Sequence, residues 1–115
     1  MKKEQTTFFL KENPTLKDFQ QYILDLENER GLSADIFHYC LMMGEEIGEL
    51  FKAIRKSENH KVDRNSKIGS IDEELTDVFI FLCGIANHYG VDLEKAFREK
   101  EEINQKRVWE KNKDS

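Results

Sequence analysis

Residues 70–90 read SIDEELTDVFIFLCGIANHYG and carry the clearest helix signals in the chain. Ser70, followed three residues later by Glu73, gives the capping-box pattern that opens a helix, and Gly90 is a typical helix stop. Between these signals, residues 78–86 are apolar on every side of the helix. A bundle of four short helices does not normally need so wide an apolar surface, so the sequence predicts that this helix contacts a second subunit.

Three further helices are predicted from apolar residues that recur every three to four positions. They span residues 15–30, about 33–56 and, after the N-cap Asp92, about 93–109. The polar residues 57–69 form the predicted connector before the third helix. Six glycines and one proline are too few for the frequent turns of a sandwich or barrel. The predicted fold class is therefore all-α, a bundle of four to five helices.

The second predicted helix also has more apolar surface than one subunit is expected to bury. Gly44 and Gly48 lie one turn apart on its wide apolar side, where the missing side chains would let another helix approach closely. We therefore expect a homo-oligomer, a dimer or dimer of dimers, in which the second and third helices of different subunits pack together.

Length, charge and hydropathy narrow the classes of protein. At 115 residues the chain fits one domain, 1–115, with a helical core over about 15–110 between a flexible N-terminal segment and a C-terminal tail. The net charge of -5 disfavours binding to nucleic acid. No apolar run approaches the roughly 20 residues that span a bilayer, so we expect no membrane association and a cytoplasmic location. Cys40 and Cys83 are predicted to be buried, reduced thiols.

Acidic pairs on two helices form the most informative pattern for function. Glu46 and Glu49 are three residues apart, so they share one face of the second helix. Glu74 and Asp77 repeat this spacing on the third helix, and in both pairs the first residue lies beside an apolar stripe. Either pair alone is more often a solvated helix edge. Two such pairs flanking a common core would bring four carboxylates together.

Four neighbouring carboxylates need a counter-charge, because unpaired carboxylates near an apolar region are costly. A divalent cation would keep them ionised. Oxygen ligands without clustered Cys or His favour Mg²⁺, with Mn²⁺ as a substitute, over Zn²⁺. The sequence therefore predicts a magnesium site between the second and third helices.

The last predicted helix turns polar where its apolar face should continue inward. Leu93 and Phe97 begin that face, and Lys100, Asn104 and Arg107 follow on it. A solvated helix end explains this pattern as well as a ligand does. A ligand with phosphate groups would suit the lysine and the arginine, while the amide can both donate and accept hydrogen bonds.

Two motifs resemble those of the MazG-like nucleotide pyrophosphohydrolases. EEIGEL at 45–50 is similar to the EExxE motif of this family, and EELTDVFIFL at 73–82 is similar to its ExxD motif. The 24 residues between Glu49 and Glu74 fit the variable connector of such proteins, and GVDLEKAFREKEEINQKRVW at 90–109 resembles their final helix. The resemblance covers about residues 15–110.

The resemblance implies an activity and a set of roles. It implies cleavage of a nucleoside triphosphate into a monophosphate and pyrophosphate, with the possible task of clearing non-canonical nucleotides. Glu45 or Glu49 would orient the attacking water. The resemblance places Mg²⁺ on Glu46, Glu49, Glu74 and Asp77, and the nucleotide on Lys100, Asn104 and, as a weaker transfer, Arg107. The alternative function is a catalytically silent helical module for oligomerisation or regulation.

Overall fold

The computed structural model describes residues 9–30 and 35–107, and over these residues it contains four helices and no strand. The all-α prediction is confirmed. The helices are α1 (Leu16–Glu29), α2 (Ile36–Ser57), α3 (Ile71–His88) and α4 (Leu93–Lys106). Ser33 and Trp109, the predicted limits of the second and last helices, lie outside the described residues. No helix in the described ranges has both the length and the apolar character that crossing a bilayer requires.

Polar caps explain where the helices begin. The Thr15 hydroxyl accepts a hydrogen bond from the Asp18 amide, and Asp18 accepts one from the Thr15 amide, which completes a capping box. Ser70 caps α3 by accepting from the Glu73 amide, as its sequence pattern predicts. Asp35 caps α2 by accepting a hydrogen bond from the Phe37 amide. Each cap satisfies an amide that would otherwise lack a partner.

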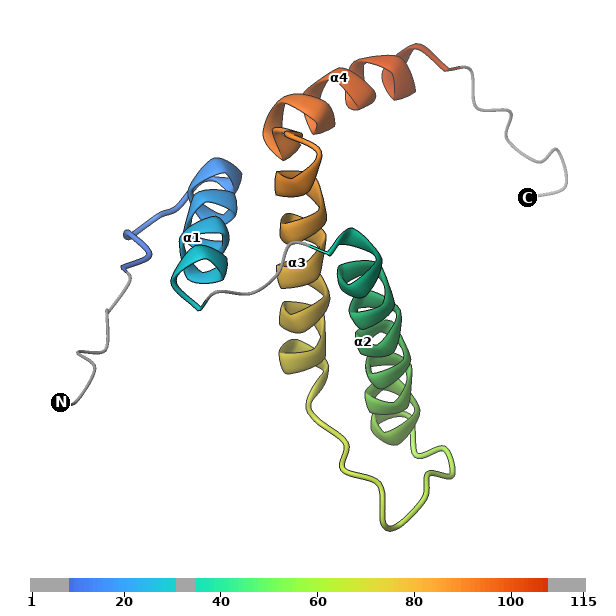
Figure 1. Cartoon of the computed structure of the whole chain (residues 1–115). Helices are drawn as coiled ribbons and strands as arrows, with labels where there is room; N and C mark the ends of the chain where they lie inside the picture. The colour runs from blue at the N-terminus through green and yellow to red at the C-terminus, as the bar shows by residue number, and fades with distance from the viewer. Residues whose placement is uncertain (1–8, 31–34, 108–115) are drawn as a thin grey trace, which may run out of the picture.

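Helices α2 and α3 run antiparallel, side by side, and make the most extensive contact in the chain. Helix α1 packs on another side of α3, while α4 follows a turn at the end of α3 and runs across it (Figure 1). Because α3 lies between α1 and α2, much of its apolar stretch is covered within one subunit. The rings of Phe79 and Phe19 meet edge to face with their centroids 5.5 Å apart, and the ring centroids of Phe81 and Tyr39 are 6.0 Å apart.

A hydrogen-bond network around Gln20 fixes the junction between α3 and α4. The Gln20 side chain is buried; it donates to the Val91 carbonyl at 2.7 Å and accepts from the Leu93 amide at 3.0 Å. The side-chain amide of Asn87 donates to the main-chain carbonyl of Gln20 at 2.9 Å. These bonds tie the first turn of α4 to α1, so the direction of α4 is set by α1 as well as by α3.

One face of α2 stays uncovered in the single chain. We call it the α2 stripe; it consists of exposed residues at alternating spacings of four and three, namely Phe37, Leu41, Gly44, Gly48 and Phe51. A Cβ added at either glycine would meet nothing within 4 Å. Among the described residues, no helix makes the close approach expected at these glycines.

Two burial predictions are wrong for the single chain. Cys83 is fully buried, but Cys40 is exposed because it lies on a side of α2 that no described helix covers. Phe97, expected to face inward, is exposed because α4 runs away from α2 and α3 instead of closing over them.

Candidate metal centre

Three of the four predicted carboxylates meet at the contact between α2 and α3. Glu46 of α2, with Glu74 and Asp77 of α3, offers oxygen atoms that all lie within 4.8 Å of one another; we call these residues the acidic trio. The three-residue spacing puts Glu74 and Asp77 on one face of α3, and the antiparallel packing of α2 brings Glu46 opposite them. The sequence pattern is sufficient to place these side chains once the two helices pair.

Electrostatic repulsion inside the acidic trio is not relieved by a neighbouring cation. Glu74 is only 8% exposed, and no Lys or Arg of the described residues forms an ion pair with any of the three carboxylates. Burial raises the pKa of Glu46, and so do a hydrogen bond with Glu74 and the charges of Asp77, Glu74 and Glu49. The arrangement therefore holds a proton, or a cation, more readily than separate carboxylates do.

The donor set fits a hard divalent cation. Oxygen ligands from two rigid helices suit Mg²⁺ or Mn²⁺, and no His or Cys belongs to this group. Mg²⁺ commonly uses few carboxylates and keeps several waters, which leaves positions for phosphate oxygens.

The other two acids predicted from the motif lie outside the acidic trio. Glu49 is close enough for its charge to act on Glu46, but its carboxylate pairs with Lys52 at 3.5 Å. Glu45 is exposed on α2.

Gly69, which the sequence analysis did not single out, shapes the acidic trio from the connector. A Cβ at this position would overlap Oε1 of Glu74 and lie 3.6 Å from Oε2 of Glu73. The missing side chain thus leaves room for the Glu74 carboxylate just before α3 begins. A glycine directly before an N-cap serine was the available signal in the sequence.

Replacing Gly69 by alanine is expected to displace the Glu74 carboxylate while leaving the helices formed. If Mg²⁺ occupies the acidic trio, the Mg²⁺ concentration for half-saturation should rise by about tenfold, the lower end of the losses seen when groups supporting a metal ligand are altered. Ser66→Ala, in the same connector, is the control. Unchanged metal dependence with normal circular dichroism would show that Gly69 has no part in placing Glu74.

Replacing Glu46 by glutamine is expected to stabilise the metal-free protein near pH 7. The raised pKa means that folded Glu46 holds its proton more tightly than unfolded Glu46, whose ordinary pKa is 4.5. The free energy of unfolding therefore falls as pH rises from 4.5 through the raised pKa of Glu46. A glutamine at this position avoids that fall. Melting in EDTA should show a higher Tm for the variant at about pH 7 and a shrinking difference toward about pH 4. A lower Tm throughout would contradict this charge balance.

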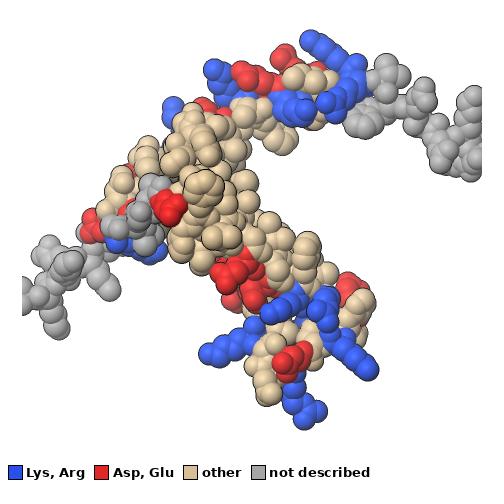
Figure 2. Space-filling model, turned by 45° about the vertical axis from the view of Figure 1, so that its right-hand side comes forward, with Lys and Arg blue, Asp and Glu red and all other residues tan. Residues whose placement is uncertain are grey.

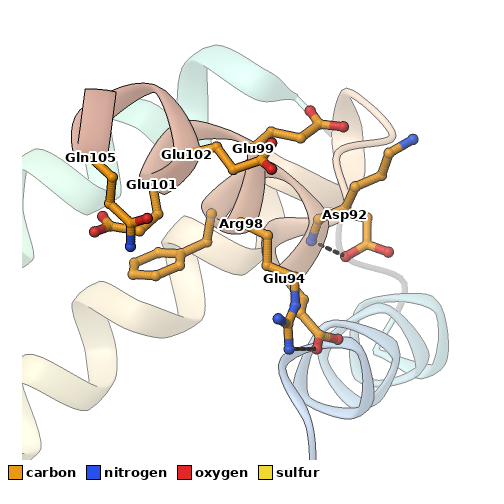
Figure 3. A pocket seen from close by; sticks show the side chains of 9 residues that line it. Asp92, Glu94, Arg98, Glu99, Glu101, Glu102 and Gln105 are labelled. Atoms are coloured by element: carbon orange, nitrogen blue, oxygen red, sulfur yellow. Dashed lines mark hydrogen bonds and ion pairs between the residues drawn. The ribbon is translucent and has the colours of Figure 1, made fainter. Parts of the chain in front are cut away.

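The residues predicted on α4 are not brought to the acidic trio within one chain. Lys100 and Arg107 are exposed and Asn104 is half-buried. Helix α4 follows the C-terminal end of α3, whereas Glu74 and Asp77 lie near its N-terminal end (Figure 1). A groove of about 670 Å³ does run along α4, but Figure 3 shows it lined mainly by other charged side chains, including Glu94, Arg98, Glu101 and Glu102. This groove includes none of the three predicted residues.

Basic side chains gather at one end of the α2–α3 pair. Figure 2 shows acidic side chains in the middle of this pair and basic side chains around the end where α2 meets the connector. Arg55 and Lys56 belong to the last turn of α2, and the Arg55 guanidinium donates to the Lys61 carbonyl at 2.6 Å. The sequence predicts only a polar connector over residues 57–69, although the lysines and arginines there were a readable signal of this basic end.

Comparisons with known proteins find one family model and similar solved structures. Residues 37–109 match the family model of the MazG nucleotide pyrophosphohydrolase domain. The crystal structure of Ctag-iMazG from Vibrio DAT 722 is similar, with 34% identity and a TM-score of 0.64, over 79% of this chain and 98% of that chain. Ntag-iMazG from the same source gives 34% identity and a TM-score of 0.63, over 79% and 94%. No curated protein sequence matches this chain.

Proposed function

The chain belongs to the MazG nucleotide pyrophosphohydrolase family and is a hydrolase of nucleotide pyrophosphate bonds, and from this premise we propose its reaction and its cofactor. The reaction is the Mg²⁺-dependent conversion of a nucleoside triphosphate and water into a nucleoside monophosphate and pyrophosphate. The observation that carries this proposal is the acidic trio, three carboxylates within 4.8 Å that lack a cation among the described residues.

In this proposal Glu46, Glu74 and Asp77 hold Mg²⁺, and Glu49 joins them when it leaves Lys52. Bound Mg²⁺ would neutralise phosphate charge and make water more acidic. Glu45 or Glu49 would orient this water and accept its proton. The water oxygen bonds to the α-phosphorus as the bond from that phosphorus to the α,β-bridging oxygen breaks, and pyrophosphate leaves. Lys56 and the lysines of the connector lie at the end of the α2–α3 pair where α2 meets the connector. Positive charge at this end would stabilise the leaving phosphates.

We place the oligomer contact on the α2 stripe. Its alternating spacing of four and three is the pattern by which helices pack along a common seam, and its two glycines permit close approach. Exposed Leu75 and Leu82 of α3, with its C-cap Tyr89, form a second row at intervals of seven residues. A homodimer that pairs these faces, alone or within a dimer of dimers, would cover both rows. It would also offer α4 of the partner as the source of groups for the nucleotide.

Lys100 and Asn104 should have separable effects if they bind the nucleotide. Lys100→Ala is expected to lower kcat/KM by about 10- to 100-fold for every nucleotide alike, because a charged hydrogen bond to phosphate is common to all. Asn104→Ala is expected to change the ratios among nucleotides, since specificity resides in differential transition-state binding. A substrate panel measures both. Equal kinetics for Lys100→Ala and wild type would remove α4 from the site.

The proposed reaction is tested by pyrophosphate release from a panel of canonical and modified nucleoside triphosphates, with Mg²⁺ and with EDTA. We expect stoichiometric monophosphate and pyrophosphate with Mg²⁺ and none with EDTA. Release of diphosphate and inorganic phosphate instead would identify a different bond. Turnover that EDTA leaves unchanged would show that the reaction does not need a metal ion.

A further inference from the structure

A largely apolar cavity lies beside the metal centre, between α1, α2 and α3. Its volume is about 350 Å³, within the usual range for small-ligand pockets. Aromatic rings from all three helices line it, namely Phe19, Tyr22, Tyr39, Phe79 and Phe81. Such a wall suits a flat, apolar ligand that can stack on aromatic side chains.

Polar side chains interrupt this apolar wall, namely Glu27, Arg30, Thr76 and the hydroxyls of Tyr22 and Tyr39. Tyr39 is only 7% exposed, yet its hydroxyl has no hydrogen-bond partner among the described residues. The Glu27 carboxylate also lines the cavity and lies near Tyr39, without a well-formed hydrogen bond between them. Burial and the charge of Glu27 raise the pKa of the Tyr39 hydroxyl. A buried hydroxyl whose neighbouring carboxylate does not make a well-formed hydrogen bond with it would gain from a ligand that offers one.

Gly84 makes room for the Glu27 carboxylate inside the bundle. A Cβ at position 84 would lie 2.9 Å from Oε1 of Glu27 and 3.6 Å from the Tyr39 ring. Because α3 has no side chain at this point, Glu27 can reach across from α1. The polar pair therefore belongs to the packing of three helices and is not an accident of a flexible surface side chain.

The cavity and the acidic trio lie along the same contact between α2 and α3. Tyr39 precedes Glu46 by seven residues on α2, while Phe81 follows Glu74 and Gly84 follows Asp77 by seven residues on α3. Seven residues are two helical turns, about 10 Å along the axis. Since α2 and α3 are antiparallel, each of these seven-residue steps away from the acidic trio leads in the same direction in space. This separation is comparable with the length of a nucleoside from its 5′ oxygen to its base.

We propose that this cavity binds the nucleobase of the substrate, with Tyr39 and Glu27 as specificity-determining residues at its polar edge. The inference rests on the proposed hydrolysis of nucleoside triphosphates. A base offers flat rings to the aromatic wall, a ring nitrogen or carbonyl to the Tyr39 hydroxyl, and an N–H group to the Glu27 carboxylate. The mainly apolar wall suits a base better than a phosphate group, although Arg30 also lines the cavity.

The hydroxyl is tested by Tyr39→Phe, with Ser66→Ala as a control because Ser66 also carries a hydroxyl and lies in the connector, outside the cavity. Kinetics are compared for the four deoxynucleoside triphosphates and for a deoxyribose triphosphate without a base. We expect Tyr39→Phe to lower kcat/KM of the preferred nucleotide about tenfold, to narrow the differences among bases and to leave the base-free compound unchanged. Its Tm should not fall, because a buried hydroxyl without a partner is removed. Glu27→Gln should change the order in which the four deoxynucleoside triphosphates rank by kcat/KM.

Binding of the four phosphate-free deoxynucleosides, followed by ligand-observed NMR, separates this inference from the proposed reaction. Nucleoside binding that Tyr39→Phe weakens, in a protein without hydrolytic activity, would support the cavity and overturn the reaction. Hydrolysis with equal losses for all substrates, including the base-free compound, would overturn the base pocket and keep the reaction. Absence of both nucleoside binding and hydrolysis would overturn the two together.

Discussion

Replacing any member of the acidic trio by its amide, as Glu46→Gln, Glu74→Gln or Asp77→Asn, is expected to lower Mg²⁺-dependent kcat/KM by at least about 100-fold. The three carboxylates lie within 4.8 Å of one another and would jointly provide the charge that retains the metal. Metal ions contribute several kcal/mol of transition-state stabilisation in such reactions, and about 1.4 kcal/mol corresponds to tenfold in rate. Glu49→Gln should also impair turnover, by weakening metal retention or the orientation of water.

Glu73→Gln is the matched control for these variants, because Glu73 is an exposed acid next to Glu74 and lies outside the acidic trio. Its turnover should stay near that of wild type. Circular dichroism should show intact helices in all of the variants. Two members of the acidic trio whose amide variants keep wild-type turnover at low Mg²⁺ would rule out this metal site.

Replacing Leu41 by glutamate is expected to weaken self-association by at least about 100-fold. Leu41 is 73% exposed in the single chain and lies in the α2 stripe next to Phe37. Burying a leucine contributes about 1.5–3 kcal/mol, and a symmetric dimer loses this contribution twice. Sedimentation of wild type at micromolar concentration should show a dimer or larger species, and the variant should sediment at 13.6 kDa.

Phe9→Glu controls for added charge, because Phe9 is an exposed aromatic residue far from the α2 stripe in the sequence. Its assembly should match that of wild type. Leu41 is a better position for this test than Phe81 of α3. Phe81 packs against Tyr39 within the chain, so its replacement would disturb the subunit itself. A wild-type protein that sediments only as a monomer would contradict the proposed interface.

Much of the fold and of the metal centre follows from local patterns. The pairs Thr15 with Asp18 and Ser70 with Glu73 mark helix starts because capping involves neighbours in the chain. The three-residue spacing of Glu74 and Asp77 places them on one helix face whatever the tertiary structure is. The position of Glu46 opposite them then depends only on the pairing of two antiparallel helices.

Features that depend on contacts between distant segments were not predictable in the same way. The direction of α4 is set by the bonds of Gln20 with Val91 and Leu93, about 70 residues away, and nothing in the apolar spacing of α4 reports them. Burial of Cys40 was expected because an apolar helix face was taken as an inner face. Such a face is equally consistent with a contact between subunits.

The position of the metal tests the central claim most directly. Crystals grown with Mn²⁺ and an α,β-imido nucleoside triphosphate would locate Mn²⁺ by anomalous scattering. We expect a peak about 2 Å from carboxylate oxygens of Glu46, Glu74 and Asp77, with phosphate oxygens completing the coordination. Mn²⁺ and nucleotide bound together elsewhere, with no peak at the acidic trio, would contradict the account.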